Sequence, residues 1–339
     1  MTKYLTIKFL LFLTLLRKGK IRPGNLWNTI AAYTLYLLKT KRSAAAPVLI
    51  NFELSNNCNE NCVFCRTEKG EIYDLRPGGP ANPIGKGTLD LEIFKGIIEQ
   101  VAKQILVAVP YVNGEPFIYK RIEQVLAELK QRRIGSIIST NGILLNDKNI
   151  DMILTQDLDL IKIHVSGFTN QIHQIQHRVG DIEIIKENLR NLSRAITARK
   201  ANIVVLIDYI EYKHNQHELQ LFRNFASELG FEFNIRPGNP KGMEASEGKQ
   251  PENSAEHIPC DFLWKALTVN WNGDLLPCCD YVVWSDTNGY ATYNKGSTDI
   301  KGVWNGPKIQ TMRYLHSSVG RSAIDICADC NRCGIEYKY

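Results

Sequence analysis

Short apolar runs and amphipathic segments alternate along the chain from residue 48 onward. The apolar runs predict strands over 48–54, 105–109, 136–140, 160–166, 203–209 and 231–235. In the intervening stretches, apolar residues recur at helical spacing over 89–103, 118–132, 181–200 and 216–229. This order of elements predicts an α/β fold with a parallel sheet and right-handed crossovers. Six β/α units indicate a partial, TIM-like (β/α)6 barrel, with ligands at the carboxyl ends of its strands.

The first 47 residues depart from this alternation and form an N-terminal helical segment. An apolar run over 9–16 and a second apolar segment over 26–39 are both flanked by basic residues. The first run is shorter than the roughly 20 residues that a membrane span requires, and no small-residue cleavage site follows it. We therefore expect neither a transmembrane helix nor an export signal. The pattern favours two helices packed on the main domain, with peripheral membrane contact through residues 1–42 as the alternative.

Two polar stretches interrupt the pattern further along the chain. Residues 66–88 are rich in Gly and Pro and are expected to form a long substrate-facing loop. Residues 237–257 are poor in apolar residues and are interpreted as a linker. The chain is thus expected to divide into N-terminal helices, a barrel, a linker and a small Cys-rich domain, with the boundaries 1–47, 48–236, 237–257 and 258–339.

Composition narrows the class of protein. Of 339 residues, 44% are apolar and 22% are charged, which excludes collagen-like, coiled-coil and wholly disordered chains. The net charge of +6 is too small for a dedicated nucleic-acid binder, so no nucleic-acid partner is expected. Nine cysteines, six of them after residue 257, are too few and too clustered for a secreted disulfide scaffold. Metal binding in a reducing cytoplasm fits them better.

The first cysteine cluster comprises Cys58, Cys62 and Cys65, on a loop that follows the first expected strand. Three thiolates can hold a [4Fe–4S] cluster and leave its fourth iron open to a ligand. Zinc is the competing interpretation, but a structural zinc site requires four ligands, and this loop contains three Cys and no His to supply the fourth. Here the chain resembles the radical S-adenosylmethionine (radical SAM) superfamily, whose CxxxCxxC signature commonly carries an aromatic residue, here Phe64, before the last Cys.

Polar residues at the ends of later strands extend this resemblance over roughly residues 48–236. Asn113-Gly114-Glu115-Pro116 is similar to the family's GGEP-like motif, with Asn113 in place of the usual first Gly. The resemblance implies that Glu115 holds the amino group of SAM. It also implies contacts to the SAM carboxylate and ribose from three residues at the ends of the third and fourth strands: Ser139, Asn141 and Ser166. The alternative for each is an ordinary role in a turn.

The C-terminal cysteines form a second constellation. Cys260 and Cys278 flank 17 residues that predict a β-hairpin with an Asn-Gly turn. This arrangement resembles the SPASM and Twitch extensions of radical SAM enzymes, and the resemblance implies an auxiliary [4Fe–4S] cluster. We expect one such cluster, as in the Twitch type. The predicted ligands are Cys260, Cys278, Cys327 and Cys330, with Cys333 as the alternate ligand for either member of the C-terminal pair.

Cys279 is the remaining thiol, and alternation along a strand would turn it away from the auxiliary cluster. We interpret it as a small buried apolar residue, with a catalytic role as hydrogen-atom donor as the alternative. His164, His173, His177 and Arg178 fall at or beyond the end of the fourth strand. Each is a candidate for proton transfer or substrate contact, and a structural role is the alternative for each.

The resemblance implies reductive cleavage of SAM to a 5′-deoxyadenosyl radical, with an electron donor such as flavodoxin or ferredoxin. The cysteine layout resembles 2-deoxy-scyllo-inosamine dehydrogenase-like enzymes, so we expect oxidation of a small carbohydrate-like or other metabolite through the auxiliary cluster. The alternatives are a peptide-modifying maturase or epimerase, for which 47 residues before the first strand look short for leader recognition, and modification of a membrane-located lipid. A non-enzymatic iron–sulfur carrier fits least well. The expected location is cytoplasmic, with membrane association as the alternative.

Overall fold

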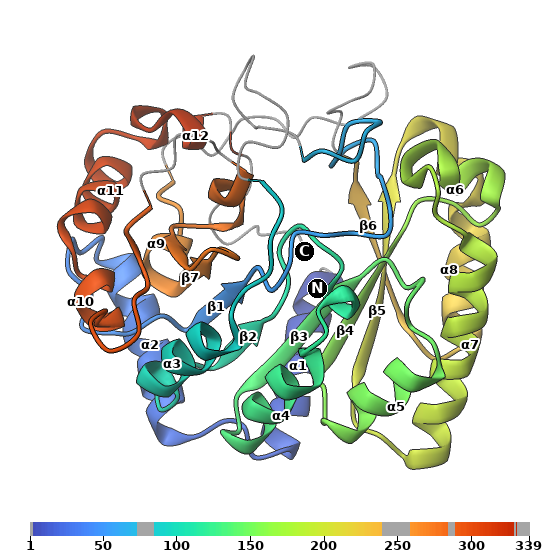
Figure 1. Ribbon diagram of the computed structural model, residues 1–339, viewed down its shortest axis with the longest axis horizontal. Coiled ribbons are helices and arrows are strands. Elements are labelled where there is room, and N and C mark those ends of the chain that lie inside the picture. Colours follow the sequence, from blue (N-terminus) through green and yellow to red (C-terminus); the bar gives the residue numbers. More distant parts are fainter. Residues whose placement is uncertain (1–2, 73–84, 239–257, 284–288, 329, 331–339) are drawn as a thin grey trace.

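One mixed sheet of nine strands organises the part of the chain that this computed structural model describes, residues 3–72, 85–238, 258–283, 289–328 and 330 (Figure 1). Its strand order is β6-β5-β4-β3-β2-β1-β7-β8-β9. The six strands expected from the sequence are parallel neighbours in that order: β1 (Leu49–Phe52), β2 (Val107–Val109), β3 (Gly135–Thr140), β4 (Leu160–Val165), β5 (Val204–Glu211) and β6 (Glu232–Pro237). The predicted partial α/β barrel is therefore present.

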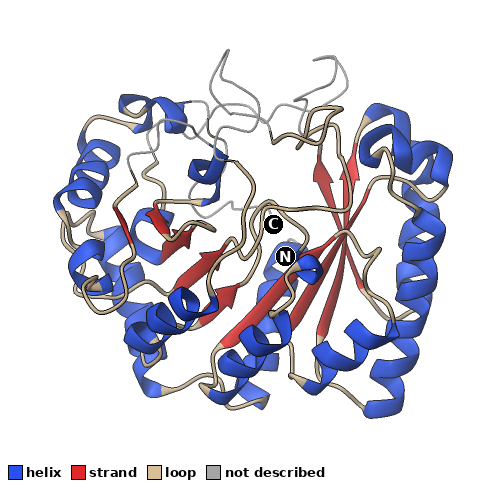
Figure 2. Ribbon diagram, in the orientation of Figure 1, coloured by secondary structure: helices blue, strands red, loops and turns tan. Residues whose placement is uncertain are grey.

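Helices line the outer face of the parallel strands (Figure 2). They are α3 (Leu91–Val101), α4 (Ile122–Gln131), α5 (Asp147–Thr155), α6 (Asn170–His177), α7 (Ile182–Arg199) and α8 (Leu219–Glu228), with short 3-10 turns at η1 (Pro116–Ile118) and η2 (Lys213–Glu218). Asp90 and Asp181 begin α3 and α7 by accepting hydrogen bonds from N–H groups of the first turn. The sequence pattern missed α5 and α6, because each is under ten residues long and rich in polar positions.

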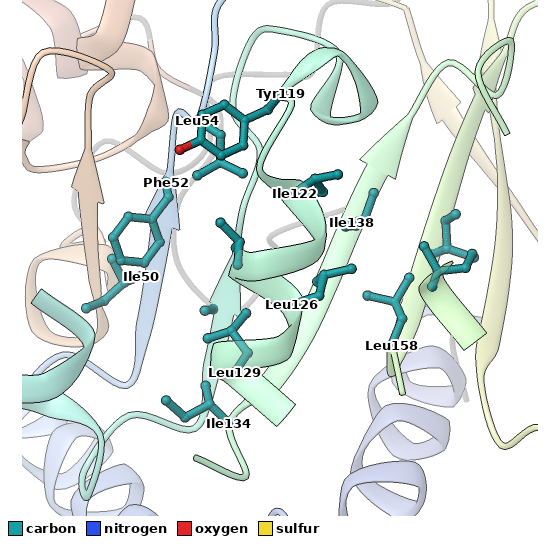
Figure 3. Packing of buried hydrophobic residues seen from close by; sticks show 14 of the residues in the cluster. Ile50, Phe52, Leu54, Tyr119, Ile122, Leu126, Leu129, Ile134, Ile138 and Leu158 are labelled. Carbon is teal, nitrogen blue, oxygen red and sulfur yellow. The ribbon is translucent and has the colours of Figure 1, made fainter. Parts of the chain in front are cut away.

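The main core fills the layer between the strands and these helices. The rings of Phe52 and Phe94 pack edge to face with centroids 4.7 Å apart. In Figure 3, side chains of β1, β3 and α4 meet in this layer, including Ile138 and Leu126. Burying a side chain of this size is worth about 1.5–3 kcal/mol. This layer holds the strands in register and leaves their carboxyl ends to carry polar loops.

The C-terminal segment continues the sheet of the barrel. β7 (Ala266–Val269) pairs in parallel with β1, and β8 (Asp274–Leu276) returns antiparallel to β7 and is followed by β9 (Ala291–Thr292). The predicted hairpin is present, and Gly273 in its turn adopts a φ of +89° that favours glycine. The other elements of this segment are α9 (Phe262–Lys265), η3 (Cys279–Val283), α10 (Ile300–Trp304), α11 (Pro307–Ser318), η4 (Arg321–Ala323) and α12 (Asp325–Ala328).

The parallel pairing of β1 with β7 was not expected from the sequence, which suggested a separate module beyond a linker. Residues Leu49 and Ala266 are partners in this pairing, although more than 200 positions separate them along the chain. Most of the predicted linker, residues 239–257, lies outside the described residues, as does most of the predicted long loop, residues 73–84. The domain boundaries stay a prediction.

Two N-terminal helices, α1 (Lys3–Arg17) and α2 (Pro23–Leu37), pack on the body as expected. Ile7 of α1 is buried with Leu160 and Leu206 of the barrel strands. Tyr36 of α2 packs against Trp264 with ring centroids 5.6 Å apart. Among the described residues, none of the helices has the length and apolar character needed to cross a bilayer.

Candidate functional site

The loop after β1 brings its three cysteines together. The carbonyl oxygen of Cys62 accepts hydrogen bonds from the backbone N–H groups of Cys65 and Arg66, at 3.0 and 2.8 Å, which closes a tight turn. Burial raises the pKa of the Cys58 thiol to about 12. Burial also raises the pKa of Cys62 well above its ordinary value, and the nearby thiols of Cys65 and Cys58 raise it further. The pKa of Cys62 thus responds to the charges of Glu60 and of both other thiols of the loop, which shows that these groups are close enough to influence its ionisation.

Such a donor set fits a bound metal centre. A cation among the thiolates would reverse the cost of ionising them, because metal coordination stabilises the deprotonated sulfur. Three cysteines leave one position of a four-iron cluster without a protein thiolate. Cys58, Cys62 and Cys65 therefore fit an iron–sulfur cluster with an open iron.

A histidine from a distant helix also reaches this loop. Nδ1 of His177, on α6, lies 2.9 Å from Oε2 of Glu60 and 3.4 Å from Sγ of Cys62. Nε2 of the same ring lies 2.9 Å from Oγ of Ser166, and His173 stacks on the ring at 4.1 Å. The loop has no His in its own sequence, but in the folded protein His177 supplies one beside Cys62. The lack of a nearby His is therefore no reason to exclude zinc from the folded site. No local pattern identified this contact, because α6 is over 100 residues away along the chain.

Glu53 binds the backbone of Asn113 and Gly114, and the sequence pattern did not identify it as a site residue. The Glu53 carboxylate accepts hydrogen bonds from the N–H groups of Asn113 and Gly114, at 2.8 and 3.2 Å. Burial raises the pKa of Glu53 to about 7. A Cβ on Gly114 would stand 1.9 Å from the carbonyl oxygen of Ser55, so the close approach of the two loops requires glycine.

The side chain of Asn113 shows where a polar ligand would complete the site. Its Nδ2 is buried and makes no hydrogen bond of good geometry within the described residues, although the same side chain faces the Glu53 carboxylate and helps to lower the pKa of that group. A buried amide donor without a partner costs free energy until a ligand accepts from it. This donor lies in the motif that the resemblance assigns to SAM, so the residues present fit that cofactor.

Glu115 connects the ends of two strands. Its carboxylate accepts from the hydroxyl of Thr140 at 2.8 Å and from the N–H of Asn141 at 3.0 Å, and it also begins η1 by accepting from Phe117. Pro116, the first residue of η1, is buried. Burial raises the pKa of Glu115 to about 7. The described contacts of Glu115 are thus with the protein, and its role toward SAM stays a prediction.

The three remaining predicted SAM contacts divide into two groups. Asn141 donates to Oδ1 of Asn59 in the cysteine loop at 2.8 Å, and Ser166 contacts the loop through His177. Ser139 instead bonds to Nε2 of His164 at 2.6 Å, on a different part of the barrel interior. The structure therefore brings Asn141 and Ser166 to the first thiol site and places Ser139 beside a separate polar network.

That network crosses the inner face of the sheet. Nδ1 of His164 lies 3.2 Å from Oδ2 of Asp208, which also accepts from Nε of Arg236 at 3.0 Å. Burial lowers the pKa of His164 to about 4. Burial alone would raise the pKa of Asp208, but the charge of Arg236 and the contact with His164 hold it well below its usual value. A neutral imidazole thus stands between a hydroxyl and an ionised carboxylate. The sequence reasoning named His164 as a candidate but missed Asp208 and Arg236.

Four of the C-terminal cysteines line a second pocket together with Phe262 and Ile326. Burial raises the pKa values of Cys260 and Cys278 well above normal, and neighbouring thiols raise them further. Four thiols around one pocket, with no disulfide among the described cysteines, match the ligand set of a closed iron–sulfur cluster. These four are the predicted ligands Cys260, Cys278, Cys327 and Cys330. Cys333 lies outside the described residues.

Cys279 directly follows Cys278 but is not among the described residues that line this pocket. It is the first residue of η3, so the expected alternation along a strand does not apply to it. Cys279 packs beside Val112 and Leu276. Burial raises the pKa of Tyr111, as do the charges of Cys65 and Cys279.

Comparisons with known proteins agree with this arrangement. The family model of the radical SAM superfamily matches residues 52–212, and that of SPASM, an iron-sulfur cluster-binding domain, matches residues 260–331. The mycofactocin maturase MftC of Mycobacterium ulcerans is 24% identical over 219 residues, which is 65% of this chain and 55% of that protein. The chain spans about half the length of the curated relatives that it matches first.

Solved structures share the fold. Streptococcus suis SuiB bound to its precursor peptide SuiA aligns with a TM-score of 0.61 and 12% identity, over 84% of this chain and 70% of SuiB. BtrN in complex with AdoMet and 2-DOIA aligns with a TM-score of 0.52 and 18% identity, over 86% of this chain and 95% of BtrN. From the thiol sites and the two matched domains, we conclude that this chain belongs to the radical SAM superfamily and carries a SPASM iron–sulfur cluster-binding domain.

Proposed function

We propose that this radical SAM enzyme modifies a peptide, removing hydrogen from an unactivated C–H bond and completing the change by oxidation of the substrate. When bound, the first cluster and SAM would supply a 5′-deoxyadenosyl radical, which is the agent of hydrogen abstraction in this superfamily. Cys58, Cys62 and Cys65 would hold that cluster. The four thiols of the second pocket would hold an auxiliary cluster able to accept an electron.

The observation that carries the choice of a peptide is the outer edge of β6. Among the described residues, β6 pairs only with β5 and ends the sheet, so its second edge offers backbone N–H and C=O groups. An extended peptide can add to such an edge as a further strand. Asn234 and Arg236 of β6 both bond to Asp208 inside the barrel, so a peptide on this edge would lie beside the His164 network.

The relatives support the same choice of substrate. MftC is named as a maturase, and SuiB was solved with a precursor peptide bound. This evidence changes the expectation from the sequence, which preferred a small carbohydrate-like metabolite and kept a peptide as the alternative. Under this proposal, the bound peptide would lie beside the His164 network, in which Nε2 of His164 bonds to Ser139 and Nδ1 faces Asp208.

Oxidation of a small carbinol or amine is the second candidate. One observation favours this candidate: within the described residues, four thiols line one pocket. One such pocket matches the one auxiliary cluster that the dehydrogenase-like cysteine layout predicts. BtrN has a similar fold and was solved with 2-DOIA. Both candidates require a one-electron donor such as flavodoxin or ferredoxin, which stays a proposal.

The test is anaerobic turnover of the reconstituted protein with SAM and dithionite. One arm contains synthetic peptides encoded by genes adjacent to this one, and the other contains 2-deoxy-scyllo-inosamine. We expect substrate-dependent 5′-deoxyadenosine, and a peptide product two hydrogens lighter, only in the first arm. The variant Arg236→Gln should raise the KM for the peptide, whereas the exposed control Arg194→Gln should not. Turnover in the inosamine arm alone would overturn the peptide proposal in favour of the dehydrogenase.

A further inference from the structure

Large apolar side chains gather on the outward side of α1 and α2. Of the 16 large apolar residues that are exposed in the described part of the chain, nine lie between residues 9 and 38. Trp27 is 68% exposed and Leu37 is 71% exposed. Isolated exposed apolar residues are ordinary, but a concentration of this kind marks an interaction surface. We define the docking face as Phe9, Phe12, Leu16, Leu26, Trp27, Ile30, Tyr33, Leu37 and Leu38.

The buried side of α2 is more polar than that of a helix on an ordinary water-soluble protein, although it also holds Ala32 and Tyr36. Its buried side includes Asn25 and Asn28, which are held by backbone carbonyl oxygens of Lys20, Ala46 and Gln104. Its exposed side carries most of the docking face, with apolar residues recurring three or four positions apart. A helix that buries amides and exposes Leu and Trp needs an apolar environment on its outer side.

The two helices form a rigid support for this face. Only residues 18–22 separate α1 from α2, and Lys18 and Lys20 in this link are ion-paired with buried Asp159. In the C-terminal half of α2, the ring of Tyr33 lies 4.1 Å from Nζ of Lys265, measured to the ring centroid. Figure 1 shows α1 behind the barrel strands and α2 beside α9. Because each helix buries its opposite side against the body, the two apolar stripes face outward.

The charge of this region is equally one-sided. Residues 1–52 contain nine of the 41 Lys and Arg residues and none of the 35 acidic ones. The rest of the chain therefore holds 32 basic and 35 acidic residues, so the positive net charge of the protein belongs to its N-terminal segment. Exposed basic residues border the docking face at Lys8, Arg17, Lys39, Lys41 and Arg42.

We infer that the docking face binds the surface of an anionic phospholipid bilayer. Apolar helices with basic borders lie in the plane of such a surface, where Trp and Tyr favour the boundary between headgroups and acyl chains. Helices of 15 residues are about 22 Å long, which suits this orientation and is too short for a span. A second copy of the chain fits less well, because its identical basic border would be repelled. The inference is independent of the proposed peptide substrate.

The test uses flotation of the reconstituted full chain with vesicles of phosphatidylcholine alone or of phosphatidylcholine mixed with phosphatidylglycerol. We expect binding to the mixed vesicles that weakens with added salt, and little binding to the neutral ones. The double variant Trp27→Ser/Leu37→Ser should reduce the partition coefficient by about tenfold or more. The control Ile184→Ser/Leu221→Ser replaces two exposed apolar residues of α7 and α8 and should bind as the parent does.

Iron content and circular dichroism equal to the parent show that the variants are folded. A second pair of variants, Lys39→Glu/Lys41→Glu and the control Lys213→Glu, tests the charge: only the first should lose binding to the mixed vesicles. Equal binding to both kinds of vesicle, or an unchanged partition of Trp27→Ser/Leu37→Ser, would overturn the inference. Vesicle-free dimerisation that disappears in Trp27→Ser/Leu37→Ser would overturn it in favour of a second copy.

Discussion

Nζ of Lys20 lies 2.7 Å from Oδ2 of Asp159, and the two side chains are only 3% and 0% exposed. Asp159 directly precedes β4, and its carboxylate also accepts from the backbone N–H of Ser136 in β3. The ion pair thus fastens the link between α1 and α2 to the amino ends of two barrel strands. It connects the docking face to the scaffold of the active site.

Replacing Lys20 by Met should lower the free energy of unfolding by about 3 kcal/mol, because it leaves the buried Asp159 charge with less compensation. The value lies at the low end for buried pairs, since Nζ of Lys18 remains 3.1 Å from Oδ1 of Asp159. Urea denaturation measures the loss. Lys295→Met removes an exposed pair with Glu92 and serves as the control, with a midpoint close to that of the parent. Equal midpoints for both variants would contradict a structural role for the buried pair.

Two separated thiol sites predict about eight irons per chain after anaerobic reconstitution. Replacing Cys58, Cys62 and Cys65 together by Ala should remove about four of them. Cys278→Ala should lower the iron content at the second site, whereas Cys279→Ala should leave it unchanged, because Cys278 lines the pocket and Cys279 is not among its lining residues. Iron and sulfide analysis measures each content. Zinc in the parent, or an iron loss in Cys279→Ala as large as that in Cys278→Ala, would refute the assignment.

The role of Glu115 can be separated from its contacts within the protein. If its charge pairs with the amino group of SAM, Glu115→Gln should remove a contact worth about 1.5–3 kcal/mol and weaken SAM binding by roughly tenfold to a hundredfold. Thr140→Val removes only the hydrogen bond from β3. Calorimetric titration with SAM compares the two variants. Equal weakening in both would show that Glu115 acts by positioning the strand, and unchanged affinity in Glu115→Gln would exclude any role in binding.

The buried His164 predicts a pH dependence of stability. Its pKa falls from 6.5 to about 4 on folding, chiefly through burial, so the unfolded chain binds the extra proton between these values. The contribution of His164 to stability, about 3 kcal/mol, is therefore complete above pH 6.5 and lost as the pH falls towards 4. Glu53 and Glu115, whose pKa values burial raises to about 7, contribute with the opposite sign, so the prediction concerns the difference between the parent and a variant that lacks His164.

The difference in denaturant midpoint between the parent and His164→Gln, measured from about pH 4.5 to about pH 6.5, checks this sign. His164→Gln should remove this part of the pH dependence, and the exposed control His217→Gln should leave it as in the parent. A slope that persists unchanged in His164→Gln would show that other groups, such as the buried His316, carry the whole effect.

The order of the six parallel strands and the candidate cysteines of both thiol sites were predictable from the sequence alone, whereas the short helices α5 and α6 were not. The alternation of apolar runs with amphipathic segments is local, and it located all six parallel strands to within a few residues. The spacing of Cys58, Cys62 and Cys65 is local as well, because one loop supplies all three. Apolar residues in α1 and α2 were also visible, but the pattern could not tell which of their sides would face outward.

Contacts between distant parts of the chain were decided by the tertiary structure. The pairing of β1 with β7 joins residues more than 200 positions apart, and His177 reaches Cys62 from another helix. Asp208 and Arg236 meet His164 only because three parallel strands lie side by side. Local periodicity reports which side of an element is apolar, whereas partner and register depend on the packing free energy of the whole core. The sequence thus determined the strands and the candidate ligand cysteines, whose role as ligands stays a prediction, and the packing determined which residues share a site.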